Sequence, residues 1–83
     1  MNSAKEDFRL RVFLTLAREK SFSKTAAALG KTQPAISASL SELERIYGLK
    51  LINRDKSGNE LTEAGKVFRE YAERVEGAYR DLA

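Results

Sequence analysis

Residues 23–43 read SKTAAALGKTQPAISASLSEL, and this stretch decides the fold class. It predicts a short, alanine-rich helix over Lys24–Leu29, a sharp turn and then a longer helix. Gly30 ends the first helix, because glycine readily adopts the positive φ of a helix C-cap. Pro34 lies in the first turn of the longer helix, where its missing N–H costs nothing. A short helix, a tight turn and a longer helix are typical of a helix-turn-helix.

The side chains of the longer helix divide into an inward and an outward set. Ile36, Leu40 and Leu43 recur at positions i, i+4 and i+7, so we expect them to pack in the core. Small side chains at Ala26 and Ala27 let the two helices cross closely. The outward set, towards the start of the longer helix, consists of Gln33, Ser37, Ala38 and Ser41.

Such an outward set fits the major groove of DNA, into which a recognition helix presents its N-terminal end. Gln33 can read an adenine edge with two hydrogen bonds. Thr32 and Ser37 are short donors suited to phosphates. The pattern also allows a plain helical hairpin whose outer side chains meet only water.

The neighbouring segments predict a compact helical core. An amphipathic helix is expected from Lys5 to Glu19, with Leu10, Phe13, Leu14 and Ala17 at helical spacing. Ser23 is expected to cap the short helix and Thr32 or Gln33 the longer one, which ends at Tyr47 before Gly48.

A small β-hairpin is predicted after Gly48. Residues 49–54 form a β-like run, residues 55–59 a turn, and residues 60–61 a returning strand. Arg54 can lie in or near a minor groove, whose narrow form concentrates negative potential. The alternative is a solvated basic turn. Lys56 is included among the predicted DNA contacts, although for Lys56 taken alone we favour that alternative.

The last helix begins after Thr62, its expected cap, and runs to the end of the chain. Twenty-one helical residues extend roughly 30 Å, so we expect the far half to meet a second copy of the chain. The alternative is packing on the first helix alone, which suits Phe68 better than Leu82.

Gly65 and Gly77 either allow close approach of another helix or are tolerated defects. A heptad-like seam with spacings of 4, 3, 4, 3 and 4 comprises Ala64, Phe68, Tyr71, Val75, Ala78 and Leu82.

The amino-acid composition excludes some kinds of functional site and argues against others. The 83 residues suffice for one small domain, which we divide into a body (1–62) and a linker helix (63–83). The sequence contains no cysteine and no histidine, which excludes disulfides and thiolate metal sites and argues against an enzyme. Glu42, Glu44 and Glu60 are interpreted as solvated surface. No metal or cofactor is expected, and no apolar run approaches the roughly 20 residues of a membrane span.

The charge is unevenly distributed. Residues 1–62 carry 11 Lys and Arg against seven Asp and Glu, whereas residues 63–83 carry four against five. An excess of positive charge in the body is compatible with a polyanionic partner.

Taken together, the motifs resemble the N-terminal domain of LysR-type transcriptional regulators. The resemblance implies a mainly α, winged helix-turn-helix domain, a linker helix that pairs with its mate in a dimer, and a larger ligand-sensing domain beyond it. Any small-molecule effector would act through that sensing domain, which is absent here. The segments that carry the resemblance are SFSKTAAAL (21–29), TQPAIS (32–37), Leu43-Glu44, GLKLINR (48–54) and LTEAG (61–65).

By position, the resemblance implies DNA contacts from Thr32, Gln33, Pro34, Ser37 and Arg54. Three departures from the family pattern stand out. Ala38, Ser41 and Glu42 occupy positions where basic side chains are common. Ile52 replaces a common Phe. Lys31 replaces an apolar residue, so the turn is either more exposed or gains a phosphate contact.

These observations predict sequence-specific binding of double-stranded DNA in the bacterial cytoplasm, at the nucleoid. A symmetric dimer would bind two half-sites of an inverted repeat. The alternative function is a protein-interaction module that keeps the helix-turn-helix scaffold without binding DNA.

Overall fold

The computed structural model describes the backbone of residues 3–55 and 58–82 and the side chains of residues 8–55 and 58–78. It confirms the predicted order of elements. These are α1 (Ser3–Glu19), α2 (Phe22–Leu29), α3 (Gln33–Tyr47), β1 (Ile52–Asp55), β2 (Gly58–Leu61) and α4 (Glu63–Leu82). Within the described ranges, no helix is both long and apolar enough to cross a membrane.

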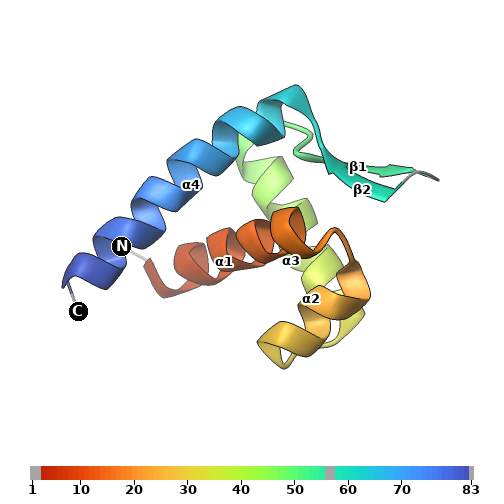
Figure 1. Cartoon of the computed structure of the whole chain (residues 1–83), viewed down its shortest axis with the longest axis horizontal. Helices are drawn as coiled ribbons and strands as arrows, with labels where there is room; N and C mark the ends of the chain where they lie inside the picture. The colour runs from red at the N-terminus through yellow and green to blue at the C-terminus, as the bar shows by residue number, and fades with distance from the viewer. Residues whose placement is uncertain (1–2, 56–57, 83) are drawn as a thin grey trace.

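Figure 1 shows α1 in the middle of the molecule, with α4 along one side, α2 on the other, and α3 crossing behind α1 from α2 towards the start of α4. The start of α1 and the end of α4 lie at the same end of the molecule, and the β-hairpin projects from the opposite end. This arrangement leaves α2, the start of α3 and the hairpin together, away from the end of α4.

Local capping sets the helix boundaries. Gly30 and Gly48 both have φ 65° and end α2 and α3, as predicted. Thr32 is the N-cap of α3, since its hydroxyl accepts a hydrogen bond from the amide of Ala35 at 3.2 Å. The prediction that Ser23 caps α2 was wrong. Ser21 holds that position, because its extended backbone lets its hydroxyl accept from the amide of Lys24 at 3.0 Å.

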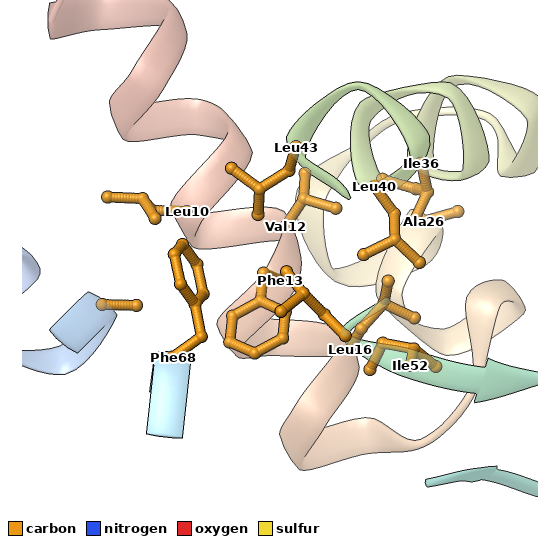
Figure 2. Packing of buried hydrophobic residues seen from close by; sticks show 12 residues of the cluster. Leu10, Val12, Phe13, Leu16, Ala26, Ile36, Leu40, Leu43, Ile52 and Phe68 are labelled. Carbon is orange, nitrogen blue, oxygen red and sulfur yellow. The ribbon is translucent and has the colours of Figure 1, made fainter. Parts of the chain in front are cut away.

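The core joins every helix to the start of the hairpin (Figure 2). Phe13, Leu16, Ile36, Leu40 and Ile52 are fully buried, which confirms the predicted inward face of α3. In α2, however, Ala26 is buried and Ala27 is exposed, so only Ala26 serves the close helix crossing.

The first strand of the hairpin begins later than predicted, and both strands extend into the segment predicted as a turn. Ile52 pairs with Leu61 and Asp55 with Gly58. Residues 56–57, which connect the strands, lie outside the described residues. Residues 49–51 are not strand. One reason is that the amides of Leu51 and Ile52 both donate to the Glu44 carboxylate, at 2.7 and 3.2 Å, instead of to another strand.

Helix α4 packs on α1 through a face that shares Phe68 and Val75 with the predicted seam but also includes Ala72. Phe68 is 7% exposed and its ring meets that of Phe13 edge-on, with centroids 5.3 Å apart. Ala72 is fully buried and Val75 packs partly against the core. Phe68 therefore has little surface left for a second chain, and the seam is corrected there, because Phe68, Ala72 and Val75 form the inward face at spacings of four and three.

Candidate nucleic-acid interface

The first turns of α3 stand clear of the protein body. Thr32, Gln33 and Pro34 are exposed, and Ser37 is half-buried. Farther along the same helix Ala38 and Ser41 are also exposed. The outward set predicted from the sequence is thus accessible in the structure.

The polar side chains of this turn are partly engaged with the protein. Gln33 donates a hydrogen bond from its Nε2 to the Ser23 hydroxyl of α2, at 3.4 Å. Ser23 is thus a neighbour of Gln33 across the turn and not a helix cap. Thr32 accepts one bond as the cap of α3, which leaves its own hydroxyl hydrogen for another acceptor. The free N-terminal amides of the helix add partial positive charge beside these side chains.

Arg54 of β1 reaches back to α3. Its Nη1 donates to the Ser37 hydroxyl at 3.0 Å. Its guanidinium carbon lies 4.4 Å from the centre of the Phe22 ring, within the range of a cation–π contact. The structure therefore brings together two residues that the sequence predicted as separate DNA contacts, and adds an aromatic ring that the sequence analysis missed.

A shallow depression of about 470 Å³ lies between α3 and the hairpin. It carries amide, hydroxyl and guanidinium groups beside apolar carbon. The lining residues are Phe22, Gln33, Pro34, Ser37, Arg54 and Asn59.

The hairpin is docked on the helices at its second strand as well. The Asn59 side-chain amide donates to the backbone carbonyl of Lys20 at 3.2 Å. Lys20 has a positive φ of 56° and its ammonium lies 3.5 Å from the Glu60 carboxylate. The segment between α1 and α2 thus supports the hairpin. No local sequence pattern predicted this contact.

Glu44 connects α3 to the start of the hairpin. Its carboxylate accepts from the amides of Leu51 and Ile52, so its interpretation as solvated surface was wrong. Glu42 pairs instead with Arg45, at 2.6 Å. That hydrogen bond, together with the charge of Glu42, raises the pKa of Arg45 above its ordinary value.

Lys31, a predicted basic contact, is not part of this cluster. The exposed Lys31 places its ammonium 5.4 Å from the centre of the Phe8 ring of α1. Lys56 lies outside the described residues. Among the side chains of residues 8–55 and 58–78, no group of three or more acidic residues is placed to hold a metal ion.

A model of the family described as bacterial regulatory helix-turn-helix protein, lysR family, matches residues 8–66. The chain belongs to the LysR family. Its relatives include the regulator BudR of Klebsiella aerogenes, 46% identical over 63 residues that cover 76% of this chain and 44% of that protein. A probable RuBisCO transcriptional regulator of Trieres chinensis is 40% identical over 67 residues, covering 81% of this chain and 22% of the relative. The chain thus spans less than half the length of these LysR-family relatives.

Solved LysR-family structures show the same fold. Vibrio fischeri DarR, in complex with DNA, matches 90% of this chain and 26% of its own with a TM-score of 0.87 and 36% identity. The BenM DNA-binding domain on catB site 1 DNA matches 92% of this chain and 82% of its own with a TM-score of 0.87 and 29% identity. The fold is therefore the winged helix-turn-helix of this family, with the hairpin as its wing.

Proposed function

We propose that this domain binds double-stranded DNA in a sequence-specific manner, as the DNA-binding part of a transcription regulator. The observation that carries the proposal is the exposed first turn of α3 with Arg54 of the wing fixed beside it. In this proposal α3 enters the major groove and Arg54 meets the backbone or the minor groove. On this proposal the protein acts at the nucleoid, in the bacterial cytoplasm.

The chemistry of the site supports this assignment. Gln33 has the amide needed for paired hydrogen bonds to an adenine edge. Thr32, Ser37 and Arg54 offer donors to phosphate oxygens, and the amides at the start of α3 favour an anion. We also assign contacts to Lys31, Pro34, Ala38, Ser41 and Lys56, as the sequence predicted. The DNA-bound structures of DarR and the BenM domain are further support.

We further propose that residues 63–83 act as a linker helix that pairs with a second copy. The support is an apolar strip left uncovered on α4. Val67 is 70% exposed, Tyr71 is 40% exposed and Ala78 is exposed, and their spacings of four and seven put them on one helix face. A two-fold dimer would present two copies of α3 to an inverted repeat.

The second candidate is a protein-interaction module without DNA binding. It is favoured by the outer face of α3, where Ala38 and Ser41 are exposed and the neighbouring Glu42 is acidic. Salt separates the two candidates. Phosphate contacts release counterions, so DNA affinity falls steeply as salt rises, whereas apolar helix packing is far less sensitive.

The deciding experiment is selection of bound sequences from a random pool of double-stranded DNA, using the purified chain. We expect enrichment of a motif with dyad symmetry, and an affinity for it that decreases linearly with salt on logarithmic axes. A single enriched half-site without a dyad would refute the dimeric arrangement. Failure to enrich any sequence would refute the proposed function.

A further inference from the structure

Phe22 is the first residue of α2, and its half-buried ring faces the wing. The ring packs partly against the core and lies under the Arg54 guanidinium, 4.4 Å from centre to carbon. Ser37 holds the same guanidinium from α3, at 3.0 Å. Helices α2 and α3 and strand β1, which are separate in sequence, thus meet at the Arg54 guanidinium.

We propose that Phe22 is a positioning residue for nucleic-acid binding, whose ring holds the Arg54 guanidinium beside the first turns of α3 before DNA arrives. The inference rests on the proposed function. In this inference Phe22 makes no contact with DNA and acts only through Arg54.

The hydrogen-bond inventory shows what this arrangement leaves available. A guanidinium has five N–H donors, and the bond to Ser37 uses one on Nη1. Ser37 accepts that bond, so its own hydroxyl hydrogen remains to be donated. Arg54 and Ser37 therefore offer donors side by side, which suits the several acceptor oxygens of a phosphate.

Holding the side chain in advance favours binding for an entropic reason. A free arginine samples many rotamers and loses that freedom when it binds. A ring face on one side and a hydroxyl on the other restrict Arg54 before the encounter, so less freedom is lost on the DNA. The ring face carries negative potential and attracts the cation, without competing for its N–H donors.

The test is a double-mutant cycle of DNA affinity, measured on the sequence selected from the pool at one fixed salt concentration. Phe22→Leu retains an apolar side chain but removes the ring face, and Phe22→Tyr restores it. We expect Phe22→Leu to weaken binding by about 3- to 30-fold, the range of a cation–π contact, and Phe22→Tyr to weaken it far less. In an Arg54→Ala background, Phe22→Leu should change affinity less than about two-fold.

An equal loss from Phe22→Leu with and without Arg54 would overturn the inference, because Phe22 would then act through the fold. Thermal unfolding of each variant checks for that effect independently. An NMR measurement without DNA reports directly on the contact between the Phe22 ring and Arg54. The Arg54 side-chain protons should show an upfield ring-current shift in the NMR spectrum of the parent and of Phe22→Tyr, and lose it in Phe22→Leu. Absence of that shift in the parent would also overturn the inference.

The outcomes separate this inference from the proposed function. If the parent selects no DNA, the proposed function fails and the inference fails with it. If the parent selects DNA but the two substitutions act independently, the positioning role alone fails.

Discussion

Gly65 of α4 lies directly against the backbone carbonyl of Leu51, and a β-carbon at Gly65 would overlap that oxygen. The same carbonyl accepts a hydrogen bond from the amide of Thr62 at 3.0 Å. Thr62 in turn donates its hydroxyl to the carbonyl of Lys50 at 2.6 Å and accepts from the amide of Gly65 at 2.9 Å. The start of α4 is thereby clamped to the segment that leads into the wing, and glycine is required by the closeness of that contact.

This contact predicts opposite effects for the two glycines of α4. Gly65→Ala should lower the free energy of unfolding by about 1–3 kcal/mol, because the overlap with backbone outweighs the gain in helix propensity. Gly77→Ala is the matched control. A β-carbon there would meet nothing within 4 Å, so stability should rise by up to about 1 kcal/mol. Urea unfolding measures both, and a Gly65→Ala domain as stable as the parent would contradict the clamp.

Glu44 is expected to anchor Leu51 and Ile52, where the chain enters the wing. Glu44→Ala should cost about 1.5–3 kcal/mol of stability, because two amides lose a charged acceptor. It should also speed hydrogen exchange at the amides of Leu51 and Ile52. Glu42→Ala serves as the control, since its exposed pair with Arg45 should contribute little to stability. Unchanged exchange at those two amides would show that Glu44 does not anchor the wing.

The two kinds of DNA contact should separate in binding measurements. Gln33→Ala should cost about 1–3 kcal/mol at one base position and relax specificity there. Arg54→Ala should weaken binding to many sequences alike and reduce the salt slope by about one phosphate contact. Fluorescence anisotropy on a panel of single-base variants distinguishes the two patterns. Parent-like binding by both variants would show that the site has been assigned to the wrong surface.

The proposed dimer face can be tested without disturbing the core. Val67→Glu places a charge on the exposed apolar strip of α4, so it should shift the chain towards monomer in sedimentation analysis while its thermal unfolding stays close to that of the parent. Glu73→Gln removes an exposed charge on another side of the same helix and should leave association unchanged. A Val67→Glu chain that still dimerises like the parent would exclude this strip as the dimer contact.

The sequence by itself determined the elements and their boundaries to within a few residues. Gly30, Thr32, Gly48 and Thr62 all occupy the capping positions that their chemistry predicted. Capping bonds and helical periodicity involve residues only three or four positions apart, so the local sequence specifies them. The inward face of α3 and the exposure of Gln33 follow from the same periodicity.

Only the tertiary structure decided which of these elements touch. The bond from Arg54 to Ser37 spans 17 positions and that from Asn59 to Lys20 spans 39, and no spacing rule encodes such pairs. The inward face of α4 was likewise undetermined, because heptad and straight-helix periods diverge slowly over a helix of this length. The structure settles it, because Phe68 packs against Phe13 and Ala72 is fully buried. Burial and the need to satisfy buried amides act across the whole fold, and no local pattern indicates the contacts that Phe22, Glu44 and Gly65 make.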